Sequence, residues 1–151
     1  MRKFTFTLQS VYDIALEVEK QRKLEMQRID DKLKRIVREL TDTITARSNA
    51  KHDCLREMAK GTDAQKLLQY EQYSERLQAT IRVLEENKAK TEREKEKCLQ
   101  AQIENRREIK TLEKLREKQY EEYTLELRKE EEKEIGDLVA YRTTISEGHH
   151  G

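Results

Sequence analysis

The sequence predicts an all-α protein: a long two-stranded antiparallel coiled-coil hairpin with an overhanging C-terminal helix. Three observations predict it. The 151 residues include no proline, which would interrupt a long helix. Charged residues make up 42% and hydrophobic residues 34% of the chain, whereas a compact domain carries about 45–50% apolar residues. Apolar residues also recur at steps of three and four, the spacing of a helix that buries one narrow stripe.

Charge and composition exclude several other classes. A net charge of only +1 and many strong helix formers argue against disorder. Basic and acidic residues are interleaved, with a mildly basic start and a mildly acidic end, so we expect no nucleic-acid partner. No apolar run approaches the roughly 18 residues that cross a bilayer, and no signal-peptide core follows the N-terminus. We therefore expect a cytoplasmic protein without membrane insertion.

The first helix is expected from about residue 8 to 60. Its apolar stripe steps by three and four through Met26, Ile29, Leu33, Ile36, Leu40 and Ile44. Toward the N-terminus, the stripe is expected to continue through Val18, then Ala15 or Ile14, and Val11. Beyond Ile44 the same spacing passes mainly polar residues, so the stripe weakens before the turn.

The turn is expected at residues 61–62. Gly61 suits the left-handed conformation just after a helix. Thr62 followed by Gln65 is a capping-box pattern, and Asp63 complements the positive end of a new helix. Because so short a connection makes two helices antiparallel, the chain is expected to form one hairpin domain over residues 1–151.

The second helix is expected over about 63–142, with a mobile tail at 143–151. Its stripe is apolar at Tyr70, Leu77, Ile81 and Leu84, and again at Ile109 and Leu112. Between these two parts the stripe is polar, and it comprises Lys88, Thr91, Lys95, Cys98, Gln102 and Asn105. Polar residues in a stripe can fix register at a cost in stability, so we expect a weaker middle.

The hairpin register follows from the position of the turn. Ile36 should face about Leu84 to Lys88, while Val11 and Ile14 should face about Ile109 and Leu112. Beyond about Arg116 the second helix should have no partner in its own chain. This overhang still carries scattered apolar residues, so it is either frayed or supported by another protein.

No arrangement of residues predicts catalysis. Cys54 and Cys98 lie too far apart in the hairpin to form a disulfide. His52 is isolated, and His149 and His150 lie in a glycine-flanked tail without metal-ligand spacing. No phosphate loop or nucleophile elbow occurs. We expect no enzyme activity, cofactor or metal.

Two apolar clusters are candidate partner-binding sites. Phe4, Phe6 and Leu8 precede the first helix, where they either pack on the open end of the hairpin or anchor a partner. After the turn come Tyr70, Tyr73, Leu77 and Ile81. Tyr73 lies off the stripe, and tyrosines are common at protein interfaces. We therefore favour partner binding over internal packing for this second cluster.

The chain resembles the FliJ family of the bacterial flagellar export apparatus. The stretch from Phe4 to Ile14 (FTFTLQSVYDI) is similar to the start of these proteins, and Tyr70 to Ile81 (YEQYSERLQATI) resembles the opening of their second helix. Chain length, the single turn near Gly61 and the absence of proline fit as well. The resemblance covers nearly the whole chain.

This resemblance implies a role. FliJ-like proteins are antiparallel coiled coils similar to the central stalk of rotary ATPases. Their terminal end lies in the pore of the export ATPase hexamer, their hairpin end reaches toward the membrane export gate, and they handle export chaperones. By position, Tyr73 and Leu77, with Tyr70 and Ile81, would form the gate-binding face, and Leu40 and Ile44 would contribute from the first helix. The first helix lacks the tyrosines that some relatives place there.

The predicted function is therefore a non-enzymatic coupling rod and chaperone-type adaptor, monomeric in isolation and peripheral on the cytoplasmic membrane face at the flagellar base. Two alternatives remain. One is the stalk subunit of another secretion or rotary ATPase, such as an injectisome homologue. The other is a structural coiled-coil scaffold, which would require an obligate homo-oligomer.

Overall fold

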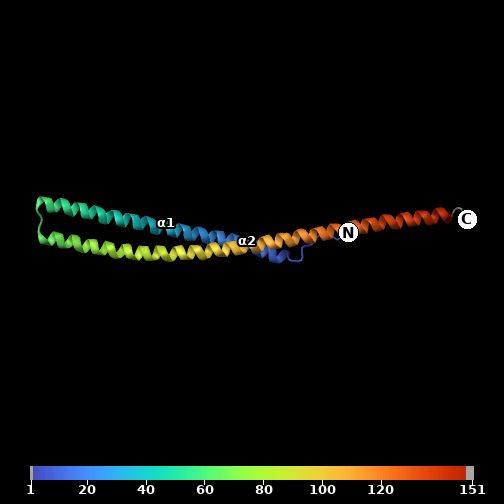
Figure 1. The fold of residues 1–151 in the computed structure, drawn as a ribbon, viewed down its shortest axis with the longest axis horizontal. Helices are drawn as coiled ribbons and strands as arrows, with labels where there is room; N and C mark the ends of the chain where they lie inside the picture. Colours follow the sequence, from blue (N-terminus) through green and yellow to red (C-terminus); the bar gives the residue numbers. More distant parts are fainter. Residues whose placement is uncertain (1, 149–151) are drawn as a thin grey trace. The chain divides into compact units, whose positions relative to one another are not determined.

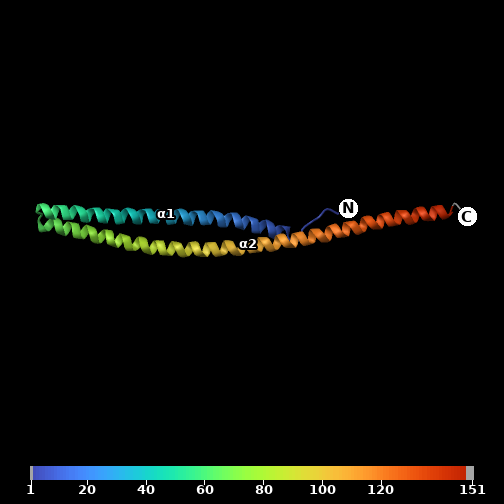
Figure 2. The ribbon, with the colours of Figure 1, turned by 45° about the horizontal axis from the view of Figure 1, so that its top comes forward.

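The computed structural model describes residues 2–148, which form two α-helices and no strand. Helix α1 is Gln9–Lys60 and helix α2 is Ala64–Gly148. The two helices are antiparallel neighbours in both ribbon views (Figures 1 and 2). The predicted all-α hairpin is confirmed.

Helix α2 continues over 143–148, where the sequence analysis expected a tail. Thr143 and Thr144 do not interrupt it, because their hydroxyls donate hydrogen bonds to the carbonyls of Val139 and Ala140 one turn earlier, both at 2.9 Å. Gly136 lies inside the helix without breaking it. His149 and His150 lie outside the described residues.

The chain divides into two compact units. Unit 2 is Lys20–Ile103, and it contains the turn. Unit 1 combines the chain before Lys20 with the chain after Ile103, of which the structure describes 2–19 and 104–148. Each unit is described by itself below, and the single hairpin domain over residues 1–151 stays a prediction.

In unit 2 the connection is residues 61–63, and its capping differs from the prediction. Gly61 has φ 84°, and its N–H donates to the Met58 carbonyl at 3.2 Å, as expected of a glycine after a helix. The cap of α2, however, is Asp63, whose Oδ1 accepts from the Lys66 N–H at 2.9 Å. The Thr62 hydroxyl is buried and has no hydrogen-bond partner within residues 2–148. The capping box at Thr62 was wrong because α2 begins one residue later.

On the α2 side of unit 2, buried or half-buried positions recur at steps of three and four: Leu67, Tyr70, Ser74, Leu77, Ile81, Leu84, Lys88, Thr91, Lys95, Cys98 and Gln102. This confirms the predicted stripe, including its polar middle. Thr91 is 1% exposed, and its hydroxyl donates to the Asn87 carbonyl at 2.8 Å. The Lys95 ammonium lies 2.9 Å from Asp30 of α1. The lysine stem therefore lies in the stripe while its charged end reaches the edge.

On the α1 side the stripe departs from the prediction near the turn. It passes through Leu40 and then Thr43, Arg47, Ala50 and Cys54, all half-buried. Ile44 is 49% exposed and therefore lies outside the stripe. A strict alternation of three and four selects Thr43 after Leu40, whereas the prediction followed apolar character to Ile44. Arg47 occupies the next position of the stripe. Its guanidinium donates hydrogen bonds across to α2, to the Ser74 hydroxyl at 3.4 Å and to the Gln78 side-chain carbonyl at 3.3 Å.

Unit 1 has a small hydrocarbon core. Ala15 of α1 packs with Ile109 and Leu112 of α2, and Leu8, Tyr12 and Leu16 pack against this cluster. The prediction that Val11 and Ile14 face α2 was wrong, because they are 42% and 63% exposed. A stripe through Leu8, Tyr12 and Ala15 places these two on the outer surface instead.

The N-terminal segment (residues 2–8) supplies α2 of unit 1 with a partner beyond Arg116. The Thr7 backbone N–H donates to Gln119 at 3.2 Å, and Gln119 donates back to the Thr7 hydroxyl at 2.8 Å. The Tyr123 hydroxyl donates to the Arg2 carbonyl at 2.6 Å. The prediction that α2 has no partner in its own chain beyond Arg116 was therefore wrong for the stretch up to Tyr123. Over 128–148 every described residue is exposed.

Candidate partner-binding surfaces

The predicted residues near the turn separate into exposed and interhelical groups. Tyr73 is 42% exposed and Ile44 is 49% exposed, so both are accessible from solvent. Four others are half-buried in the stripe between α1 and α2: Leu40, Tyr70, Leu77 and Ile81. These four contribute to holding the hairpin together whatever else they contact.

Three of the predicted residues meet at one groove of unit 2. Ile44 from α1 and Tyr70 and Ile81 from α2 line a groove of about 530 Å³. Polar groups edge the same groove: Arg47, Ser48, Lys51 and Ser74. Tyr73 is not among the lining residues. This groove thus combines the exposed Ile44, the half-buried side chains of Tyr70 and Ile81, and two cations, Arg47 and Lys51.

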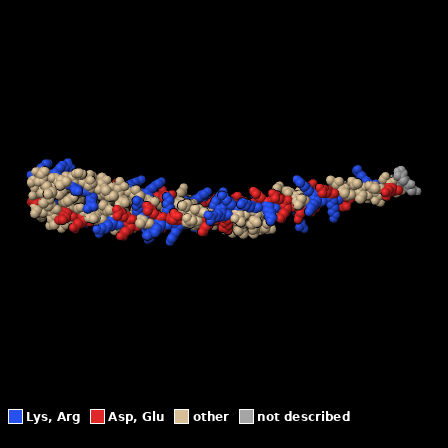
Figure 3. Space-filling model, in the orientation of Figure 1, with Lys and Arg blue, Asp and Glu red and all other residues tan. Residues whose placement is uncertain are grey.

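Sequence reasoning missed a further apolar group at the turn. Leu55, Met58 and Leu68 are each more than half exposed, at 52%, 51% and 53%. All three lie near Gly61 in the sequence and outside the interhelical stripe. Apolar residues at positions outside the stripe are expected to be exposed, and this signal could have identified them. Figure 3 shows that the surface in view is largely uncharged near the turn. Exposed large apolar side chains on both helices near one turn are suited to contact with another protein.

The three N-terminal candidates are packed inside unit 1. Phe6 is 4% exposed and Leu8 packs on the hydrocarbon core. The Phe4 ring meets Tyr120 edge-on, with centroids 5.2 Å apart, and lies 5.6 Å from Tyr123. This arrangement corresponds to the first of the two alternatives from the sequence, in which these residues pack on the open end of the hairpin. A partner-binding role for these residues stays a prediction.

Beside Phe4, unit 1 has a groove of about 480 Å³. Three aromatic rings line it, from Phe4, Tyr12 and Tyr120, together with three charged residues of α2, Glu113, Arg116 and Glu117. The Tyr12 hydroxyl donates to the Glu113 carboxylate at 3.4 Å. Sequence reasoning did not identify this groove, because its residues come from three segments whose register only the folded chain defines.

The last part of α2 carries an exposed apolar face. Ile135, Leu138, Val139 and Tyr141 are between 59% and 66% exposed, and Ile145 is 42% exposed. Their spacing of three and four places most of them on one side of the helix. Because exposed apolar area is unfavourable in water, this face is suited to contact with another protein.

The described residues show little that points to chemistry. Cys98 is 5% exposed and Cys54 half-buried, and both are free thiols. Burial, and then the nearby Glu25 carboxylate, raise the pKa of Cys98 above its ordinary value of 9.0, although Arg22 acts in the opposite direction. Within 2–148 no three His, Cys, Asp or Glu side chains converge as metal ligands. Neither described helix contains a stretch that is both apolar enough and long enough to cross a membrane.

Comparison with known proteins gives the family. The model of the family described as "Flagellar FliJ protein" matches residues 4–146, which is nearly the whole chain. The chain belongs to the FliJ family. Membership makes it a flagellar, export-related protein. No curated protein and no solved structure matches this FliJ-family chain.

Proposed function

We propose that this FliJ-family chain is a non-enzymatic coupling rod and chaperone-type adaptor of the flagellar export apparatus. In this proposal unit 1 contacts the export ATPase hexamer, and the turn end of unit 2 contacts the membrane export gate. The chain also escorts export chaperones, and it acts at the cytoplasmic face of the membrane at the flagellar base. Family membership over residues 4–146 is the observation that carries this proposal.

The exposed apolar residues support two contact sites rather than one. Unit 2 presents Tyr73, Ile44 and the exposed apolar residues near the turn, and unit 1 presents the face from Ile135 to Ile145. Each lies in a different unit. A protein that links two partners needs two such surfaces, whereas an adaptor with one partner needs only one.

A pair of tyrosine variants tests the assignment of partners to units. Tyr73→Ala removes an exposed ring from unit 2, and Tyr141→Ala removes a ring from unit 1 that is 66% exposed. Tyr73→Ala should weaken binding to the purified export gate about tenfold or more, as expected for a hot-spot aromatic. Tyr141→Ala should leave gate binding unchanged. Circular dichroism controls for folding, because loss of helix in Tyr73→Ala would assign that ring to packing.

The ATPase contact needs a separate measurement. Adding the chain to the purified export ATPase should promote hexamer formation and ATP turnover, and Leu138→Asp should reduce both effects. If the intact chain changes neither, the coupling role is excluded. A scaffold function instead requires an obligate homo-oligomer, which sedimentation of the isolated chain would reveal; we expect an elongated monomer.

A further inference from the structure

The groove of unit 1 joins two features that together define a ligand chemistry. Aromatic rings from Phe4, Tyr12 and Tyr120 supply electron-rich faces, and Glu113 and Glu117 supply two carboxylates. Aromatic faces attract cations through the ring quadrupole, and carboxylates attract them directly. A neutral apolar ligand would leave both carboxylates without a counter-charge.

The carboxylates are not neutralised by the groove itself. Within residues 2–148, Glu113 accepts a single hydrogen bond, from the Tyr12 hydroxyl at 3.4 Å. Glu117 has no ion pair within 2–148, and neither has Arg116, the one cation that lines the groove. The charge balance of the lining residues is therefore negative by one, with two carboxylates against one guanidinium.

We propose that this groove binds an arginine side chain presented by a partner protein. Arginine fits better than lysine, because its planar guanidinium stacks on an aromatic ring while its N–H groups reach a carboxylate in a fixed fork. Tyr120 is 52% exposed, so its ring is accessible for stacking. Glu113 and Glu117 are one helical turn apart on α2, the spacing at which two carboxylates share one face.

The proposal goes beyond the coupling role, since it assigns a ligand chemistry to unit 1 and does not depend on which export component carries the arginine. Phe4 packs on the rings of Tyr120 and Tyr123. Those contacts fix one wall of the groove, because the N-terminal segment is tied to α2 through Gln119 and Tyr123.

The test uses short peptides and the full chain. Acetyl-Gly-Arg-Gly-amide is titrated while the ring resonances of Tyr12 and Tyr120 are followed by NMR, with the citrulline peptide as a neutral counterpart of the same shape. We expect the arginine peptide to shift both rings and to bind at least tenfold more tightly than the citrulline peptide. The lysine peptide should bind more weakly than the arginine peptide.

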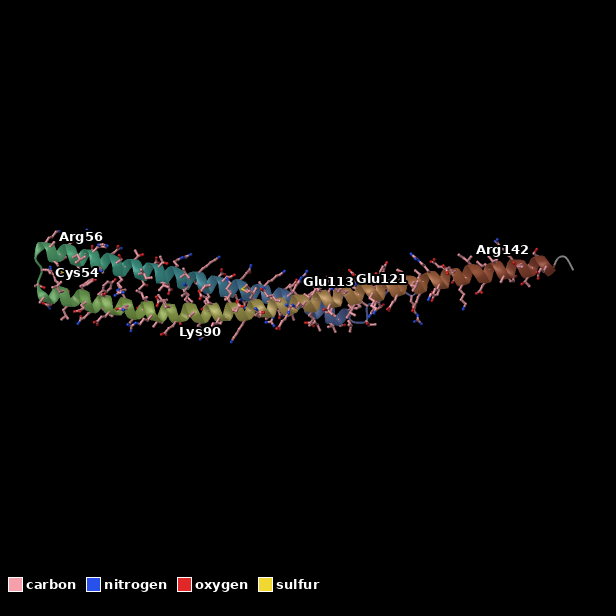
Figure 4. The ribbon with its side chains drawn as sticks, viewed as in Figure 1. Cys54, Arg56, Lys90, Glu113, Glu121 and Arg142 are labelled. Carbon is pink, nitrogen blue, oxygen red and sulfur yellow. The ribbon has the colours of Figure 1, made fainter. Side chains whose placement is uncertain are left out.

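Variants then identify the groups responsible. Glu117→Gln should weaken arginine binding roughly threefold, as for a partly exposed ion pair. Arg116→Gln should strengthen it, because a like charge is removed. Glu121→Gln is the matched control: this glutamate follows on the same helix as Glu113 (Figure 4) but does not line the groove, so binding should be unchanged.

Three outcomes would overturn the proposal. Equal affinity for the citrulline peptide would show that charge is not recognised. Equal weakening by Glu117→Gln and Glu121→Gln would indicate general attraction to an acidic helix. NMR shifts confined to the ring resonances of Tyr73 or Tyr141 would show that the peptide binds outside this groove. None of these outcomes bears on ATPase stimulation or gate binding, so the coupling role would be judged separately.

Discussion

The two units of this chain bury different chemistry in the same helix-pair geometry. In unit 1 the interhelical contact is mainly hydrocarbon, centred on Ile109, which is fully buried, and the buried polar Asn105 beside it donates a hydrogen bond to the Ala15 carbonyl at 3.3 Å. In unit 2, three described residues are buried, and only Leu84 is aliphatic; the others are Thr91 and Cys98. Apolar burial is the main source of stability for paired helices. The stability of unit 1 should therefore depend on a few residues, and that of unit 2 on many weak contacts.

This difference shows how a long helix pair can fix its pairing register without being equally stable along its length. Polar groups in unit 2 find local partners, such as Lys95 with Asp30 and Thr91 with the Asn87 carbonyl. Such contacts are worth little individually when exposed. The Lys95–Asp30 pair joins α2 to α1 and therefore favours the register in which the two side chains meet, whereas the Thr91 hydrogen bond lies within α2 and forms in any register.

Ile109→Ala should give the largest effect, because it removes a side chain with 0% exposure from the centre of unit 1. We expect unit 1 to lose about 3 kcal/mol of unfolding free energy. Amide hydrogen exchange measures this locally in each unit. Ile135→Ala, at a position 61% exposed on the same helix, should cost less than about 0.5 kcal/mol. Similar losses for both variants would contradict a hydrocarbon core at Ile109.

Gly61→Ala should destabilise unit 2 by about 1–2 kcal/mol, because an L-residue is strained in the left-handed conformation. The φ of Gly61 is 84°. Gly136 lies inside α2, where an added Cβ would meet nothing within 4 Å. Gly136→Ala should therefore stabilise the helix, by about 1 kcal/mol. Thermal unfolding followed by circular dichroism compares the two, and a stabilising shift for Gly61→Ala would refute the turn conformation.

Asp63→Ala should cost about 1 kcal/mol, because Asp63 caps the first turn of α2. Thr62→Val is the informative control. If Thr62 were the cap, as the capping-box pattern predicted, this change would cost as much. Because its hydroxyl has no partner within the described residues, we expect no loss of stability in urea unfolding.

Thr91→Val should be nearly neutral or stabilise unit 2 by about 0.5 kcal/mol, since it replaces a buried hydroxyl by a methyl group of similar shape. Among the described residues, the hydroxyl's single partner is a carbonyl of its own helix. Hydrogen exchange in unit 2 measures the change. A loss above about 1 kcal/mol would show that the polar stripe contributes to stability as well as to register.

The smallest effect concerns pH. Burial, followed by Glu25, raises the pKa of Cys98 above 9.0 in the folded chain. Below pH 9 the thiol is protonated in both states, so its contribution is fully present. As pH rises toward the folded pKa, only the unfolded chain loses the proton, so stability falls. Cys98→Ala should lose less stability between pH 8 and 10 than the parent chain, as measured by urea unfolding at each pH; equal slopes would exclude a contribution from this thiol.

The sequence by itself determined the helices, the position of the turn and the stripe on α2, because these depend on local spacing. Steps of three and four from Tyr70 to Leu112 specify which side chains meet the partner helix, whatever that helix is. The glycine at position 61 and the absence of proline similarly act within a few residues. The family resemblance rested on the same local stretches, and the family match confirmed it.

Tertiary structure decided what depends on residues from separate segments. It paired Arg47 of α1 with Ser74 of α2, and it placed Leu8, while Val11 is exposed, against the cluster that contains Ile109. It also laid residues 2–8 along α2, where Phe4 helps to form the aromatic groove. These outcomes depend on which side chains fit together across two helices, and spacing along one helix carries no information about that fit.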